Sequence, residues 1–157
     1  MMIEIRSAEI PGTLEDARVL VRAHVSAALD AEATDAIVDA LPKPYVPPRG
    51  GLWVAYVDEE PAGSAALREH QPDIAEIKRM YVAPSYRKMG VARTLLRYVI
   101  REANNLGYGT VRLGTLTTMH PAQSLYESEG FRSIPAYRSI EFGDTAFYEM
   151  DLKPTNP

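Results

Sequence analysis

The 157-residue sequence has the length of one ordinary domain, so we expect a single domain over residues 1–157. Apolar residues make up 46% and charged residues 24%, as in globular proteins and unlike disordered or membrane proteins. The net charge of −4 argues against a broad nucleic-acid-binding surface, which needs clustered Lys and Arg, and gives a cationic small substrate a mildly favourable field.

The chain contains no cysteine, which excludes disulfides, thiolate metal sites and a cysteine nucleophile. Its three histidines, His24, His70 and His120, are not spaced like metal ligands, so we predict no metal site. No apolar run reaches the ~18 residues that span a bilayer, and the acidic N-terminus is unlike a signal peptide. We therefore expect a cytoplasmic protein that binds neither membranes nor nucleic acid.

The first third of the chain predicts a strand, two helices and a long loop. Residues 3–8 alternate as in a strand, and residues 13–30 repeat apolar side chains at helical spacing behind Thr13 as the N-cap. A short helix over about 32–41 leads into LPKPYVPPRGG (41–51), where four prolines and two glycines predict an irregular loop.

The rest of the chain predicts a mixed α/β fold. Strands at 52–57, 64–69 and 74–83 are joined by turns and predict an antiparallel meander. A helix from Gly90 to Gly107 and a strand at 110–116 follow, then a helix at 120–130 and strands at 131–134 and 145–152. The crossover from 74–83 through the helix to 110–116 should place two strands parallel, paired or splayed.

The stretch YRKMGVA (86–92) has the properties of an anion-binding turn. A helix N-terminus exposes unpaired N–H groups and a partial positive charge, Gly90 allows close approach, and Arg87 and Lys88 add charge. The pattern R-x-x-G-x-A is neither a Walker motif nor a dinucleotide-binding turn. The alternative is a plain helix start with a solvated basic turn, but the preceding strand end favours a phosphate site.

The segment EIKRMYVAPSYRKMGVARTLLRYVIREANNLGY, followed by VRLGT and AQSLYESEGF, resembles the GNAT superfamily, the Gcn5-related N-acetyltransferases. The resemblance covers residues 74–131 and fades before residue 50, where members differ in substrate. It implies a GNAT fold: a mostly antiparallel twisted sheet of six or seven strands with a splayed parallel pair, flanked by about four helices. It also implies acetyl-CoA as co-substrate.

The resemblance places acetyl-CoA in a V-shaped opening between the strands 74–83 and 110–116. The pyrophosphate would be held by the turn and the first residues of the helix: Arg87, Lys88, Met89, Gly90, Val91, Ala92 and Arg93. The pantetheine arm would pair with Met80, Tyr81 and Val82, one of whose amides could stabilise the thioester oxyanion. The alternative for these three residues is ordinary strand pairing.

A protonated amine cannot attack a thioester, so the reaction needs a base, directly or through water. Glu76 is the candidate, because it matches the glutamate used as base in some family members. Period-two alternation puts Glu76 on the same face as Met80, about 13 Å away. The alternatives are that Glu76 only pairs with a cation such as Lys78, that water carries the proton, or that Glu69 or Asp73 serves.

Tyr126 matches the family tyrosine that protonates the departing CoA thiolate, and its alternative role is packing under the sheet. Met119 stands where many relatives carry an asparagine that contacts the pantetheine arm. His24, Tyr45 and Arg49 could face the acceptor, although each is more often a surface or core residue.

The sequence thus predicts transfer of an acetyl group from acetyl-CoA to an amine by direct attack, since no cysteine can carry the acyl group. The acceptor stays open between a small amine, an amino acid, an antibiotic and a protein N-terminus, and a longer acyl group is an alternative donor. The rival function is a non-catalytic sensor or scaffold that binds acetyl-CoA or CoA. A homodimer through the terminal strands is a further expectation.

Overall fold

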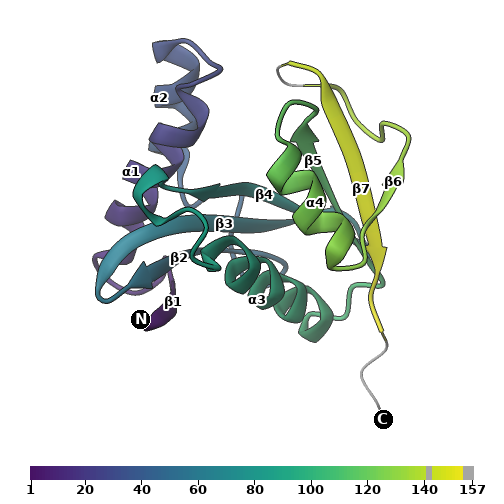
Figure 1. Ribbon diagram of the computed structural model, residues 1–157, viewed down its shortest axis with the longest axis horizontal. Coiled ribbons are helices and arrows are strands. Elements are labelled where there is room, and N and C mark those ends of the chain that lie inside the picture. Colours follow the sequence, from purple (N-terminus) through teal and green to yellow (C-terminus); the bar gives the residue numbers. More distant parts are fainter. Residues whose placement is uncertain (141–142, 154–157) are drawn as a thin grey trace.

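The computed structural model describes residues 1–140 and 143–153. Within these residues seven strands form one sheet in the order β1-β2-β3-β4-β5-β7-β6, surrounded by four α-helices and one 3-10 turn (Figure 1). The strands are β1 (Ile3–Ser7), β2 (Gly51–Val57), β3 (Glu60–Gln71), β4 (Ile74–Val82), β5 (Thr110–Leu116), β6 (Arg132–Ile134) and β7 (Thr145–Asp151). The helices are α1 (Thr13–Val25), α2 (Ala31–Ala40), α3 (Val91–Asn105) and α4 (His120–Ser128), and the 3-10 turn is Pro84–Tyr86.

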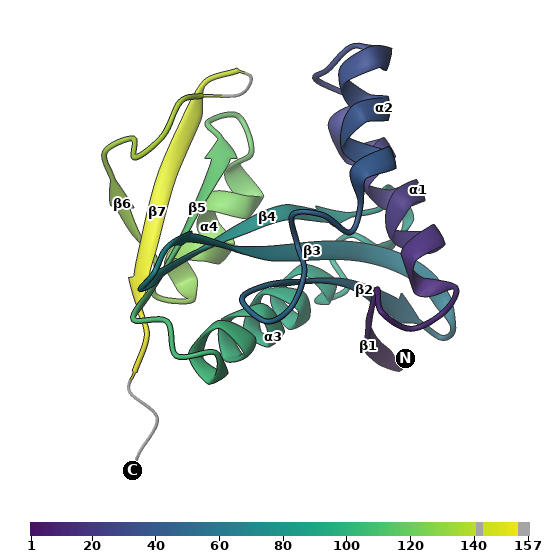
Figure 2. The same cartoon turned by 180° about the vertical axis from the view of Figure 1, so that it is seen from behind.

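The sheet separates two apolar cores. Alternate side chains of β2 enter each: Leu52 and Val54 pack with α1 and α2, whereas Trp53 and Ala55 pack with α3. Figure 2 shows α1 and α2 on the opposite side of β3 and β4 from α3. Because both faces are covered, β2 is a nearly continuous apolar run, as strands buried on both sides require.

The predicted parallel pair is present and splayed, which confirms the expected fold class. β4 and β5 pair in parallel from Ile74↔Thr110 to Ile77↔Leu113, and then the pairing ends. β4 continues to Val82 while still paired with β3, and β5 continues to Leu116 while paired with β7. We call the unpaired region between residues 78–82 and 114–116 the splay.

A β-bulge interrupts β4 just where the splay begins. Between Ala66↔Lys78 and Ser64↔Tyr81, β3 advances two residues and β4 three, and Arg79 adopts a φ of 56°. The extra residue reverses the alternation of side chains. Ile77 and Met80 therefore both pack toward α3, and Glu76 faces the α1 and α2 side, so the prediction that Glu76 and Met80 share a face was wrong.

The helices predicted over 13–30 and over about 32–41 are both present, but the first ends earlier than predicted. α1 ends at Val25, and α2 begins after Asp30, whose side chain accepts a hydrogen bond from the Ala33 amide at 2.8 Å. Asp30 thus acts as an N-cap that periodicity alone did not reveal. Thr13 is the buried first residue of α1 rather than its cap, because Gly12 occupies the cap position.

Candidate active site

The N-terminus of α3 lies directly after the end of β4. Gly90 is the N-cap in a left-handed conformation, with a φ of 83°, and no side chain caps the helix. Among the described residues, no hydrogen bond engages the amides of Val91, Ala92 and Arg93, the three that open the helix. A helix end with free amides and positive dipole potential is suited to an anion.

The space above Gly90 is open. A Cβ atom built on Gly90 would meet no atom within 4 Å, so a ligand can approach the backbone closely. Arg87 links this turn to β4, because its Nε donates to the Val82 carbonyl at 3.0 Å and its guanidinium lies 6.0 Å from the Tyr81 ring centre. The predicted pyrophosphate residues and the predicted pantetheine residues are therefore contiguous in space.

The edge of β4 that faces the splay carries Met80, Tyr81 and Val82. On its other edge this part of β4 pairs with β3 at Ser64↔Tyr81 and Gly63↔Val82. On the splay side the ladder to β5 has ended, so backbone groups there have no strand partner. These groups can bind an extended, amide-containing ligand as an additional strand would.

Glu76 is fully buried and held by three side chains. Its carboxylate accepts hydrogen bonds from Arg68 at 2.9 Å, and from Tyr137 and Arg138 at 2.6 Å each. Burial by itself raises the pKa of Glu76, but the hydrogen bonds from Tyr137 and Arg138 and the charge of Lys78 outweigh it and lower the pKa to about 2. Glu76 is thus an ionised anchor for two guanidinium groups.

Tyr137 and Arg138 were missed by the sequence analysis. They follow β6 and reach Glu76 across 61 and 62 residues of chain. Tyr137 also packs at 5.0 Å against the rings of His70 and Phe147. Their segment has no periodicity and no motif, so the only available signal was their aromatic and basic character.

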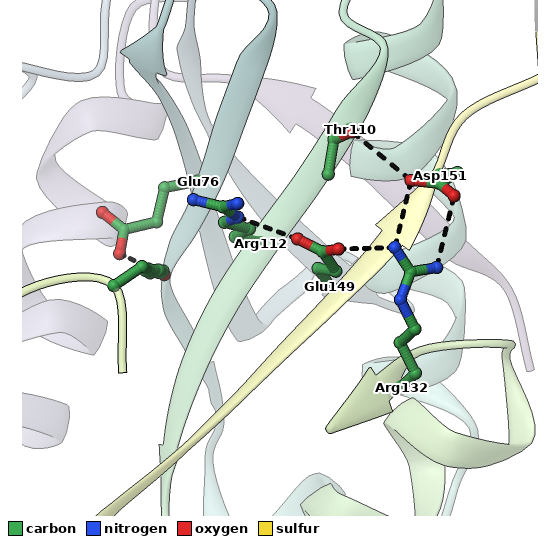
Figure 3. A network of polar contacts seen from close by, with 7 residues as sticks. Glu76, Thr110, Arg112, Arg132, Glu149 and Asp151 are labelled. Carbon is green, nitrogen blue, oxygen red and sulfur yellow. Dashed lines mark hydrogen bonds and ion pairs between the residues drawn. The ribbon is translucent and has the colours of Figure 1, made fainter. Parts of the chain in front are cut away.

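A row of alternating charges extends from Glu76 across the sheet (Figure 3). Arg112 is the register partner of Glu76 on β5, and its Nε donates to Glu149 on β7 at 2.9 Å. Glu149 also pairs with Arg132 on β6. Opposite charges on neighbouring strands attract, so this row stabilises the pairing of β4, β5, β7 and β6.

Tyr126 lies on α4, in the core on the α3 side of the sheet. Its ring packs against Phe131 at 5.8 Å and Tyr148 at 6.2 Å, and the residue is 4% exposed. Burial raises the pKa of the Tyr126 phenol. Within the part of the chain that the structure describes, its hydroxyl has no hydrogen-bond partner.

The three residues considered for acceptor contacts divide between two places. His24 stacks on Tyr81 with ring centres 5.6 Å apart, and Tyr45 accepts a hydrogen bond from Arg79 Nε at 3.1 Å, so both lie on the α1 side of β4. Arg49 instead binds Glu69 and the carbonyls of Leu106 and Pro72. It therefore fastens the proline-rich loop to the sheet edge.

No cluster of three or more His, Cys, Asp or Glu side chains among the described residues could hold a metal ion. Likewise, none of the helices in residues 1–140 and 143–153 has the length and apolar character needed to cross a bilayer.

The chain is similar in sequence to known N-acetyltransferases and to an acetylated-amino-acid synthetase. An uncharacterized N-acetyltransferase of Schizosaccharomyces pombe is 31% identical over 96% of this chain and 95% of its own length. Human N-acetylaspartate synthetase is 36% identical over 76% of this chain, but the match covers only 38% of the synthetase.

Solved structures share the fold. A GNAT-family acetyltransferase of Staphylococcus aureus superposes with a TM-score of 0.81 at 21% identity, covering 97% of this chain and 100% of that one. A Bacillus subtilis acetyltransferase in complex with CoA superposes with a TM-score of 0.73 at 23% identity, covering 97% of this chain and 100% of that one. The sequence profile of the Acetyltransferase (GNAT) family matches residues 20–131, and this chain therefore belongs to the GNAT family.

Proposed function

We propose that this protein transfers the acetyl group of acetyl-CoA to an amine by direct attack on the thioester. The observation that carries the proposal is the combination of the unpaired β4 edge with the uncapped N-terminus of α3. One ligand can use both only if it has an extended amide-containing arm and a phosphate group. CoA has both, and the Bacillus subtilis acetyltransferase with the same fold is in complex with CoA.

In this proposal the chain holds acetyl-CoA from α3 to the splay. The pyrophosphate lies against the amides of Val91, Ala92 and Arg93, next to Arg87, Lys88, Met89 and Gly90. The pantetheine arm runs along Met80, Tyr81 and Val82. A β4 amide directed at the thioester oxygen then stabilises the oxyanion that forms when the amine attacks.

Glu76 supports proton removal from the amine, and two modes of action are open to it. As a direct base it would have to be exposed to the amine, with a pKa near the working pH. Its burial, its three hydrogen bonds and its pKa of about 2 favour the other mode, in which it positions Arg138 and Tyr137 and a water molecule takes the proton.

Tyr126 is the proposed acid for the leaving thiolate. A CoA thiolate resembles a free thiolate of pKa about 8.5, so it needs a proton donor as the carbon–sulfur bond breaks. A phenol is protonated at neutral pH and so has a proton to give, while burial, which raises the pKa of Tyr126, makes it a weaker acid. Its hydroxyl is also uncommitted among the described residues.

The proposed acceptor is the amino group of a free amino acid. Human N-acetylaspartate synthetase, at 36% identity over 76% of this chain, is named for a product of that class. Because the match covers only 38% of the synthetase, aspartate is a first candidate and not an assignment.

Thiol release from acetyl-CoA, followed with a thiol-reactive dye, tests this function. The protein contributes no thiol, because it contains no cysteine, so every thiol detected comes from the cofactor. We expect turnover with amino acids in a panel that also contains polyamines, aminoglycosides and peptides. Acetyl-CoA binding without turnover across the panel would instead favour a non-catalytic sensor.

A further inference from the structure

Arg79 is a buried cation at the bulge of β4. It is 9% exposed, and its Nε donates to the Tyr45 hydroxyl at 3.1 Å. No carboxylate lies within ion-pair distance of it among residues 1–140 and 143–153. By contrast, the guanidiniums of Arg68 and Arg138, on the same side of β4, both pair with Glu76. A buried charge is costly unless something compensates it, so a ligand anion at Arg79 would be strongly favoured.

His24 presents a second uncompensated polar group beside the same strand. Its Nδ1 atom is buried and has no hydrogen-bond partner in the described structure, whereas buried polar atoms nearly always have one. Burial, together with the charges of Arg79 and Lys78, lowers the pKa of His24 to about 4, so the ring is neutral at neutral pH. A neutral imidazole protonated at Nδ1 can donate a hydrogen bond to a carboxylate.

These two groups converge on the strand that carries the thioester site. His24 stacks on Tyr81 at 5.6 Å, and Arg79 precedes Tyr81 by two positions on β4. Arg79 is therefore close in sequence to the Met80–Tyr81 backbone, and its guanidinium and the His24 ring both lie on the α1 side of β4. An anion bound there and an amine that attacks at this backbone can belong to one compact molecule.

We propose that Arg79 and His24 form a carboxylate subsite, so that the acceptor is a small amine with a carboxylate a few bonds from its nitrogen. The inference rests on the proposed acetyl transfer and narrows its acceptor. Arg79 binds the carboxylate through charge-assisted hydrogen bonds, and His24 Nδ1–H donates a further one. The net charge of −4 does not oppose this, because a cation in direct contact with a carboxylate acts on it more strongly than distant charges do.

The subsite is tested by measuring each of several substrates with the wild type and with the variants. Wild-type kcat/KM is measured with α-amino acids, including aspartate, with their α-amides and with spermidine. We expect the acids to exceed the amides by on the order of 10- to 100-fold, because each amide lacks the charge that Arg79 binds. In Arg79→Gln this ratio should collapse toward 1, mainly through a higher KM for the acids, while acetyl-CoA affinity stays unchanged.

Arg49→Gln is the matched control, because Arg49 fastens the same proline-rich loop that carries Tyr45 without approaching the splay. It should leave the acid-to-amide ratio at the wild-type value. If Arg79 served only to hold the loop, Arg79→Gln would slow acids and amides equally, and the proposal would be wrong. A preference for spermidine over every amino acid would also overturn it.

A binding measurement separates this inference from the proposed function. Aspartate and glycine are titrated calorimetrically into the CoA-loaded protein, with folding checked by thermal denaturation. Binding that is lost in Arg79→Gln and weakened in His24→Ala supports the subsite even if no thiol is released. Absence of any amino-acid binding to the CoA-loaded wild type would overturn the subsite while leaving acetyl transfer to other amines open.

Discussion

At the scale of single residues, Glu76 is a candidate base whose carboxylate already binds neighbouring side chains. Its carboxylate is buried and bound by Arg68, Tyr137 and Arg138. We expect Glu76→Gln to lower kcat at least about tenfold while the pH–rate profile keeps its wild-type shape, because the titrating base is a different group. If the variant lost the acid limb of that profile, the prediction would be wrong and Glu76 would be the direct base.

The same carboxylate makes stability depend on pH. The folded pKa of about 2 lies below the ordinary value of 4.5, so Glu76 stabilises the fold above pH 4.5 and this contribution disappears as the pH falls toward 2. The difference corresponds to on the order of 3 kcal/mol. Denaturant unfolding between pH 2 and 7 should show wild type losing more stability than Glu76→Gln, and parallel curves would contradict this.

Tyr126 offers a second test of chemistry at one residue. We expect Tyr126→Phe to reduce kcat by about 100-fold without changing acetyl-CoA affinity, because the variant keeps the ring but has no proton to donate. Tyr148→Phe is the control, since that ring packs at 6.2 Å from Tyr126 and its hydroxyl already bonds Glu127. Equal losses in both variants would point to packing and not acid catalysis.

At the scale of elements, the turn into α3 can be tested with a strain-matched pair. Gly90→Val should weaken CoA binding more than tenfold, since a β-branched side chain fills the open space over the helix amides. Gly107→Val is the control, because Gly107 also has a positive φ, of 90°, and open space, but at the other end of α3. Both variants should lose about 1–2 kcal/mol of stability from backbone strain, and only Gly90→Val should lose CoA. Comparable CoA affinities in the two variants would contradict a phosphate site there.

The elements also show what the sequence could and could not predict. The meander, the crossover and α3 follow from local patterns, because periodicity and glycine positions record which face is buried. No sequence pattern indicated the bulge at Arg79. Arginine does not favour a positive φ, and pairing with β3 holds Arg79 in that conformation. That one residue changed the face of Glu76 relative to Met80, and so the geometry expected for the base.

Local sequence patterns also could not predict contacts between segments that are distant in the sequence. The predicted turn and strand residues lie next to each other in the structure, because they are consecutive in sequence. Tyr137 and Arg138 reach Glu76 only after β5, α4 and β6 have been placed. Such contacts form only in the folded chain, so local sequence patterns did not predict that Tyr137 and Arg138 bind Glu76.

At the scale of the whole molecule, the proposed cofactor bridges parts that the sheet itself leaves apart. Beyond Ile77↔Leu113 no ladder connects β4 to β5, so the two halves of the sheet meet only at their paired ends. A ligand lying in the splay adds contacts from α3 and β4 that exist only in the folded state, and it should therefore stabilise the native protein.

CoA at 100 times its Kd should stabilise the fold by about 2.7 kcal/mol, which for a domain of this size raises Tm by about 5–10 °C. Differential scanning calorimetry with and without CoA measures this shift, and Gly107→Val should reproduce it on its own lower baseline. Gly90→Val should shift much less at the same CoA concentration. A wild-type Tm that does not respond to CoA would show that the splay and the helix end do not act as one site, and acetyl transfer by this chain would lose its structural basis.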